Sequence, residues 1–172
     1  MPTGTGRHTI SVRSHSGREY DIVFGTEILC GNWNCTYHCI DCHLPSTADN
    51  KRYILRLGKK SMPLSVLKTE WQNNALSAQF NHVNIIHTHD HGLVLKQTRL
   101  RSGKRRISGV FSILEYCDGG ELFEYTRDQW NRDNVCSDMK VMIRLADGIK
   151  YIHDRGYIHG DLKTENVLIT RQ

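Results

Sequence analysis

The stretch that decides the fold lies near the end of the chain and reads His159-Gly160-Asp161-Leu162-Lys163-Thr164-Glu165-Asn166-Val167-Leu168-Ile169. It sets a carboxylate at Asp161, an ammonium at Lys163 and an amide at Asn166, between a helical pattern and a short apolar run. A loop at this place lets the carboxylate and the amide point to the same side. The simpler interpretation is a solvated polar loop that follows a helix.

The residues around this stretch carry the periodicity of a helix and then of short strands. Ser137 is predicted as the N-cap of a long helix that Gly156 ends, and residues 157–158 and 167–169 are predicted as short strands. The apolar side chains that line the helix are Met139, Met142, Ile143, Leu145, Ala146, Ile149, Tyr151 and Ile152.

The first two thirds of the chain are predicted to be mostly sheet. Residues 65–80 carry apolar side chains at steps of three to five and predict one helix, and residues 121–130 predict another. Residues 1–18 form a polar lead-in, and residues 45–50 a turn. The predicted strands span residues 20–28, 36–41, 52–57, 93–100 and 107–116. The change from sheet to helix suggests two lobes that join near residues 115–120.

Residues 159–169 resemble the catalytic loop of eukaryotic-type protein kinases, H-R-D-L-x-x-x-N, with Gly160 in place of the arginine. The resemblance implies that Asp161 is the catalytic base, that Lys163 contacts the transferred phosphate and that Asn166 is a Mg²⁺ ligand. Lysine at position 163 is the serine/threonine pattern of the family. The arginine commonly receives an activation-loop phosphate, so switching by that phosphate is not expected here.

Residues 113–125 resemble the hinge between the two kinase lobes. The resemblance implies that the backbone of Glu115 and Cys117 binds adenine, that Leu114 is the gatekeeper and that Glu121 lies near the ribose. Without the family, the same residues read as a strand, a Gly-Gly turn and an amphipathic helix. The order of this segment before the catalytic loop favours the hinge. Asn81-His82-Val83-Asn84-Ile85-Ile86 also resembles the segment that follows the regulatory helix of kinases.

The phosphate-binding loop of the family, G-x-G-x-x-G-x-V, is matched only loosely. The best register places Leu29, Gly31, Asn34 and Thr36 at its fixed positions, with Trp33 at the tip. Gly31 is the one glycine retained, and side chains at the other glycine positions should crowd the phosphates. A plain β-hairpin is the alternative.

The lysine of the family that pairs with the phosphates aligns with Arg56, whose planar guanidinium does not replace an ammonium freely. Counting back from the segment after the helix, its glutamate partner falls on Asn73, while Glu70 lies one turn earlier. Ile54 and Leu168 complete the nucleotide-binding residues that the resemblance implies.

Composition indicates a globular protein of the cytoplasm or the nucleus. Hydrophobic residues make up 38% and charged residues 24% of the 172 residues, and no apolar run approaches the roughly 20 residues that span a bilayer. The net charge of +5 is concentrated around residues 99–106. That segment is a solvated loop, or else a signal for nuclear import or for phosphate-rich partners. Nucleic-acid binding is not expected.

The cysteines and histidines leave a metal site open. Six cysteines in a cytosolic chain are expected to be free thiols. A zinc site would draw on Cys35, Cys39, Cys42, His38 and His43, although residues 39 and 42 of one strand point to opposite faces. His87, His89 and His91 would share one strand face, as a solvated surface or a metal site.

These observations predict an α+β, protein-kinase-like bilobal fold. Residues 19–172 form an incomplete kinase domain, with a complete small lobe at 19–114, a hinge at 115–120 and the start of a helical large lobe at 121–172. The resemblance implies transfer of a phosphoryl group from ATP, with Mg²⁺, to protein serine or threonine. A pseudokinase or decoy module that binds a protein partner is the alternative.

The printed residues stop before the family's Asp-Phe-Gly motif. We therefore expect the 172-residue polypeptide to be inactive alone, and to associate through the uncovered stripe Met142, Leu145, Ile149 and Ile152.

Overall fold

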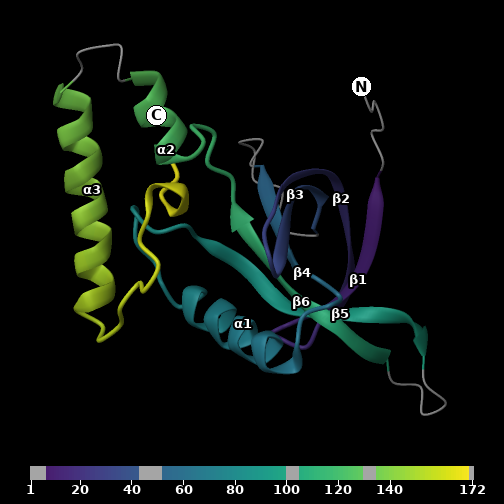
Figure 1. The fold of residues 1–172 in the computed structure, drawn as a ribbon. Coiled ribbons are helices and arrows are strands. Elements are labelled where there is room, and N and C mark those ends of the chain that lie inside the picture. The colour runs from purple at the N-terminus through teal and green to yellow at the C-terminus, as the bar shows by residue number, and fades with distance from the viewer. Residues whose placement is uncertain (1–6, 43–51, 100–104, 130–134, 171–172) are drawn as a thin grey trace. The chain divides into compact units, whose positions relative to one another are not determined.

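The computed structural model describes residues 7–42, 52–99, 105–129 and 135–170. The chain divides into two compact units (Figure 1). The first consists of Met1–Asn81 with His87–Tyr116, and the second of His82–Ile86 with Cys117–Gln172. Position 43, the turn at 45–50 and the tip of the basic segment at 100–104 lie outside the described residues.

The first unit is a closed, antiparallel sheet with the strand order β1-β2-β3-β4-β6-β5, drawn from purple to green in Figure 1. Its pairing of β1 with β5 closes the sheet. The strands are β1 (His8–Ser14), β2 (Glu19–Cys30), β3 (Asn34–Asp41), β4 (Tyr53–Gly58), β5 (Thr88–Arg99) and β6 (Arg105–Glu115).

Alternation along the strands builds the core of this unit, because successive side chains of a strand point to opposite faces. Val12, Ile22, Leu55, Phe111 and Ile113 are fully buried and pack into one cluster. The strand interiors therefore carry the hydrophobic stabilisation, at roughly 25 cal/mol per Å² of apolar area removed from water.

Strand β1 lies in the stretch that the sequence analysis predicts to be a polar lead-in. Its polar side chains are satisfied across the strand pair instead of by solvent alone. The Ser11 hydroxyl donates to Asp21 at 2.6 Å, and the Arg13 guanidinium pairs with Glu19 at 2.6 Å. The polar composition of this stretch therefore gave no indication of the strand, although its Val12 is completely buried.

Helix α1 (Leu64–Ser77) packs against β5 and β6. It is shorter than the predicted 65–80 and begins directly after Pro63, which is its N-cap residue. Its one buried residue is polar: the Asn74 amide donates to the backbone oxygen of Phe111 at 3.4 Å. This bond ties the helix to the middle of β6.

The second unit contains α2 (Leu122–Gln129), α3 (Val135–His153) and the 3₁₀ turn η1 (Thr164–Asn166). α2 packs against η1. Helix α3 begins before Ser137, so Ser137 lies inside the helix and is not its N-cap. The predicted end is close to the observed one, because Gly156 has a φ of 77°, the left-handed conformation that favours glycine.

The short strands predicted in this unit are mostly absent from the described residues. Residues 157–158 form no strand, and the run at 167–169 contributes a single bridge, between Leu168 and Glu121. Less of the predicted apolar stripe of α3 is exposed than expected. Met142 is exposed, but Ile152 is buried within the structure.

The segment His82–Ile86 belongs to the second unit although it lies far from α3 in sequence. The Asn84 amide donates to Asp147 at 2.9 Å, and the His82 ring lies 3.4 Å from the same carboxylate. A Cβ on Gly148 would lie 2.9 Å from the Asn84 backbone oxygen, so glycine permits this close approach.

In the described part of the chain, no helix combines the length and the apolar character that crossing a bilayer requires.

Candidate functional site

The predicted catalytic loop forms a compact polar cluster within the second unit. The Asn166 amide nitrogen donates to both the backbone oxygen and the carboxylate Oδ2 of Asp161, at 2.8 Å each. The Lys163 ammonium lies 3.3 Å from the same Oδ2. The structure therefore brings the three predicted catalytic residues together, and all three are exposed to solvent.

The backbone explains why this short stretch holds that geometry. The Asn166 N–H donates to the Lys163 oxygen at 3.0 Å and closes the turn η1, which folds the amide back over Asp161. Gly160 has a φ of 77°, a conformation that L side chains rarely adopt. Glycine at the position where the family pattern has arginine is thus suited to the backbone of this chain.

The cluster also sets the protonation state of Asp161. The hydrogen bond from Asn166, and then the bond and charge of Lys163, hold the pKa of the Asp161 carboxyl below its ordinary value. The carboxylate is therefore ionised in neutral solution. An ionised, solvent-facing carboxylate can accept a proton from a hydroxyl group, which is the action required of a general base.

The donor set of the cluster fits Mg²⁺. Both bonds that Asn166 makes to Asp161 use its amide nitrogen, which leaves the amide oxygen as an acceptor. Hard divalent cations take oxygen ligands of this kind. Asn166 is therefore chemically suited to the role of metal ligand that the sequence analysis assigns to it.

Glu121 and Leu168, both predicted to lie beside the nucleotide, are brought together by a β-bridge. The Leu122 N–H donates to the Val167 oxygen at 2.7 Å, and the Gly119 N–H to the Ile169 oxygen at 2.8 Å. A Cβ on Gly119 would lie 2.6 Å from that oxygen. This pairing attaches the end of the catalytic loop to the segment that begins at Cys117, whose thiol is not in a disulfide.

In the first unit, Ile54, Arg56 and Leu114 share one face of neighbouring strands. Ile54 pairs with Leu114 between β4 and β6, and Leu55, which points the other way, is buried in the core. The N–H of Glu115 donates to the His87 oxygen at 3.1 Å. The adenine contacts of Glu115 and Cys117 remain predictions.

The partner of Arg56 is Glu70, and not the position Asn73 that counting along the sequence gave. The Arg56 guanidinium lies 3.2 Å from the Glu70 carboxylate, while Asn73 is exposed. The Asn34 amide donates to the same oxygen of Glu70 at 3.2 Å. The sequence analysis missed this second donor, since only the pairing of β3 with β4 brings Asn34 near the helix.

The hairpin between β2 and β3 differs from the expected phosphate-binding loop. The Gly31 N–H donates to the Asn34 oxygen at 2.8 Å and is thus used within the turn. The Leu29 oxygen accepts a bond from the Thr36 hydroxyl at 3.2 Å. Loops of the family present backbone N–H groups to phosphates. Because the Gly31 N–H already donates within the turn, this hairpin is less suited to bind phosphates.

The cysteines are not all free thiols as expected, because Cys30 and Cys35 form a disulfide across β2 and β3. The zinc site that the sequence left open is not assembled among the described residues. Cys35 is in the disulfide, and Cys42 lies in the core cluster with the partly buried Cys39 packed against it. A hydrogen bond between Cys39 and Cys42, together with burial, raises the pKa of Cys39. Position 43 lies outside the described residues.

The three histidines of β5 and its approach do not form one group. The rings of His87 and His89 lie 4.5 Å apart. His91 is buried and stacks on His15, with 4.8 Å between ring centroids. Burial, and then the charge of His15, lower the pKa of His91, so this ring is neutral at neutral pH.

Comparison with known proteins identifies the family. The sequence pattern of the family described as protein tyrosine and serine/threonine kinase matches residues 56–172, which is more than half of the chain. Maternal embryonic leucine zipper kinase of Xenopus tropicalis is 44% identical over 63 residues, which cover 35% of this chain and 9% of that protein.

Matches that cover more of the chain are also to protein kinases. The interferon-induced, double-stranded RNA-activated protein kinase of Mus musculus is 32% identical over 129 residues, 70% of this chain and 24% of that protein. Serine/threonine-protein kinase KSP1 of Saccharomyces cerevisiae is 28% identical over 126 residues, 70% of this chain and 11% of that protein. The matches thus span a quarter or less of each relative. With a kinase-type catalytic loop, an α+β fold and these matches, this chain belongs to the protein kinase family.

Proposed function

We propose that this chain supplies the nucleotide-side strands and the catalytic loop of a kinase domain that transfers a phosphoryl group from ATP to serine or threonine of a protein. The observation that carries the proposal is the cluster of Asp161, Lys163 and Asn166, with contacts of 2.8 Å and 3.3 Å. Such transfer depends mainly on positioning and on neutralisation of phosphate charge.

Each residue of the cluster has a separate task in this proposal. ATP with bound Mg²⁺ supplies the transferable phosphoryl group and the charge that offsets it. Asp161, kept ionised by its neighbours, accepts the proton of the attacking hydroxyl. Lys163 stabilises negative charge on the group in transit. Asn166 orients Asp161 through its amide nitrogen and offers its oxygen to the cation.

A second candidate function, a kinase-fold module that binds a protein partner without catalysis, has its own support. The Gly31 N–H is used within the hairpin, and position 56 carries arginine where the family has lysine. Both features are expected to weaken binding of the ATP phosphates. This candidate predicts that nucleotide binding is weak and that adenine contacts contribute more than phosphate contacts do. For either function we propose the cytoplasm as the location.

The test compares two polypeptides, each beside its Asp161→Asn variant. One is the 172-residue chain, for which we expect no phosphotransfer because its sequence does not include an Asp-Phe-Gly. The other joins residues 1–172 to the remainder of a serine/threonine kinase domain, beginning at its Asp-Phe-Gly. We expect transfer to serine or threonine in this chimera, and a loss of at least about 100-fold in the variant.

Each result is informative. A cooperatively folded chimera that is inactive, or whose activity is the same in the Asp161→Asn variant, would contradict the catalytic proposal and favour the binding module. Activity of the 172-residue chain that disappears in its own variant would show that the Asp-Phe-Gly motif is dispensable.

A further inference from the structure

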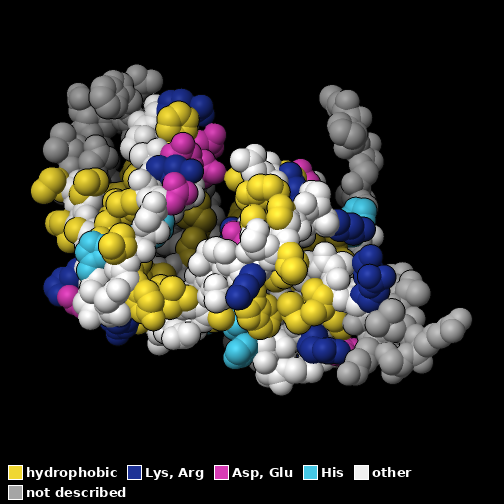
Figure 2. Space-filling model, turned by 60° about the horizontal axis from the view of Figure 1, so that its bottom comes forward, with side chains coloured by type: hydrophobic (Ala, Val, Ile, Leu, Met, Phe, Trp, Pro, Cys, Tyr) yellow, Lys and Arg dark blue, Asp and Glu magenta, His cyan; other side chains and the backbone are white. Residues whose placement is uncertain are grey.

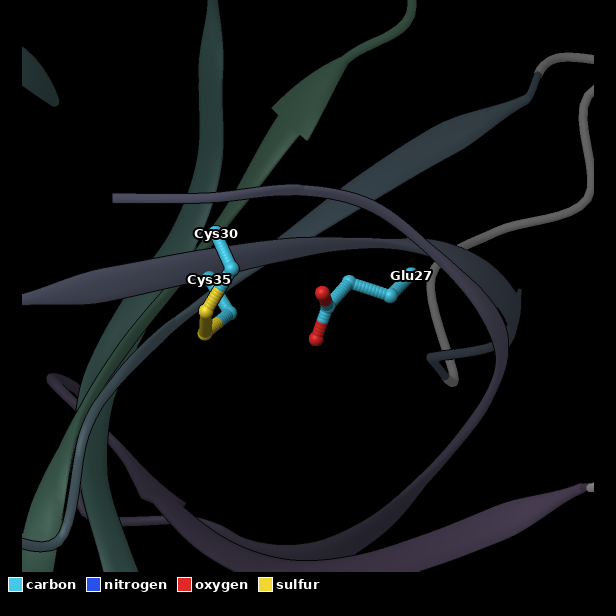
Figure 3. A group of neighbouring side chains, drawn as sticks. All are labelled: Glu27, Cys30 and Cys35. Carbon is cyan, nitrogen blue, oxygen red and sulfur yellow. A yellow bond between two sulfur atoms is a disulfide. The ribbon is translucent and has the colours of Figure 1, made fainter.

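The tip of the β2–β3 hairpin carries a group of donors that the kinase function does not use. Glu27, Cys30 and Cys35 place a carboxylate oxygen and two sulfurs within 4.8 Å of one another. Figure 3 shows the Glu27 carboxylate on the same side of the hairpin as the disulfide. We propose that these three residues bind a thiophilic divalent cation, of which Zn²⁺ is the type, when the Cys30–Cys35 disulfide is reduced.

The backbone keeps the two sulfurs close in either redox state. Cys30 and Cys35 are direct partners in the β2–β3 ladder, and their Cα atoms are 4.0 Å apart. The Gly31 N–H bond to the Asn34 oxygen closes the turn between them without help from the sulfurs. Donors of one tetrahedral zinc ion lie about 3.3–3.8 Å apart, given bonds of about 2.0–2.3 Å. After reduction, rotation of the two cysteine side chains would have to bring the sulfurs from bonding distance to this spacing.

The third donor is already oriented. Glu27 pairs with Tyr37 across the same two strands, and the Tyr37 hydroxyl donates a hydrogen bond to its carboxylate. Hydrogen bonds from outside a metal site commonly fix the orientation of a carboxylate ligand in this way.

The site combines two exposed donors with one buried donor. Glu27 and Cys30 are exposed and can receive an ion from solution, while Cys35 is buried and anchors the site in the sheet. The other neighbouring thiols, Cys39 and Cys42, are less suited. Cys42 is buried in the core cluster and Cys39 packs against it, and the raised pKa of Cys39 opposes formation of the thiolate that binds metal.

The chemistry balances with a dithiol as the reductant. Two electrons and two protons pass from the dithiol to the Cys30–Cys35 disulfide, which gives two thiols and converts the dithiol to its own disulfide. The cation then displaces the two thiol protons and binds two thiolates, and Glu27 contributes a carboxylate that is already ionised. Three protein ligands leave a fourth position for water. The disulfide and the metal complex therefore exclude each other.

The experiment uses the whole chain, reduced and then freed of reductant without oxygen. Co²⁺ is the probe, because its tetrahedral thiolate complexes absorb characteristically, and Zn²⁺ is then added to displace it. We expect one ion per chain, an affinity that falls with falling pH as the thiols regain protons, and no such absorption from the chain with its disulfide intact.

Variants locate the site. Cys30→Ser, at an exposed position, should abolish the thiolate absorption, and Glu27→Gln should weaken binding by at least about tenfold. Cys117→Ser is the matched control for an unrelated thiol and should bind as the parent does. Circular dichroism checks that each variant is folded.

Three results with the variants would overturn the proposal. They are binding by Cys30→Ser equal to that of the parent, an unchanged affinity in Glu27→Gln, and loss of binding in a folded Cys39→Ala variant while Cys30→Ser still binds. The absence of any Co²⁺ complex in the reduced, folded chain would overturn it equally.

Discussion

The two units of the chain are stabilised in different ways. In the first, the apolar side chains converge inside a closed sheet, and its core residues have almost no exposed area. In the second, many apolar side chains reach the surface: on α3, Met139, Met142 and Ile143 are each more than half exposed. Figure 2 shows hydrophobic side chains on one face of the molecule.

Polar links and close backbone contacts replace a large core in the second unit. Asp147 receives Asn84 and faces His82, Gly148 lies against the Asn84 backbone, and the Gly119–Ile169 pairing holds the catalytic loop. The unit that carries the catalytic loop therefore depends on a few specific contacts, whereas the sheet depends on the sum of its buried apolar area.

Truncating a phenylalanine should affect the two units very differently. Phe111→Ala removes a fully buried ring from the sheet and should lower the free energy of unfolding by about 3–5 kcal/mol. Phe123→Ala removes a half-exposed ring of α2 and should cost less than about 1 kcal/mol. Urea unfolding of both variants measures the difference. Equal losses would mean that the second unit has a core comparable to the first.

Adding a methyl group at Gly148 should destabilise the second unit. In an unobstructed helix, Gly→Ala stabilises by about 1 kcal/mol, but here the new Cβ would lie 2.9 Å from the Asn84 oxygen. We therefore expect a loss of about 1–3 kcal/mol, with increased amide exchange in α3. The control Ala146→Gly, at an exposed position of the same helix, should lose only about 1 kcal/mol. A more stable Gly148→Ala would refute the close contact.

The ion pairs of the two units should also differ. Arg56 and Glu70 are partly shielded, with side chains 36% and 16% exposed, so a double-mutant cycle should give a coupling of about 0.5–1 kcal/mol. The Glu124–Arg127 pair of α2 is exposed, with 3.9 Å between its charged atoms. Its coupling should be below about 0.5 kcal/mol. A reversed order would show that exposure does not govern these pairs.

The smallest effect concerns the protonation of Asp161. Asn166→Ala removes the first cause of the lowered pKa of Asp161, and so that pKa should rise toward its ordinary value. Because the pKa is depressed in the folded chain, the associated stabilisation is present above the ordinary pKa. It is lost as the pH falls through the folded value. Carboxyl NMR titration measures both proteins, and an identical midpoint would mean that Asn166 does not act on Asp161.

The sequence predicted best what is local along the chain. Asp161, Lys163 and Asn166 lie within six residues, so one turn suffices to join them, and the pattern of the loop defines the family. The helices α1 and α3 were predicted from apolar spacing to within a few residues at most ends.

Features that depend on pairing between distant segments were missed. In β1, Ser11 and Arg13 find side-chain partners on β2, which the composition of β1 alone does not reveal. The Arg56–Glu70 pair needs the placement of α1 beside the sheet, and the Cys30–Cys35 disulfide needs the register of β2 with β3. A one-residue shift of that register would turn the sulfurs to opposite faces.

The five residues His82–Ile86 make the second unit discontinuous along the chain. The polypeptide enters that unit, returns to form β5 and β6, and enters it again at Cys117. A fragment expressed from Cys117 onward would therefore omit the segment that holds α3 at Asp147 and Gly148. Along the chain, Asn84 precedes its partner Asp147 by 63 residues. The segment therefore reaches α3 by long-range closure, and the residues from Cys117 onward do not form the whole unit by themselves.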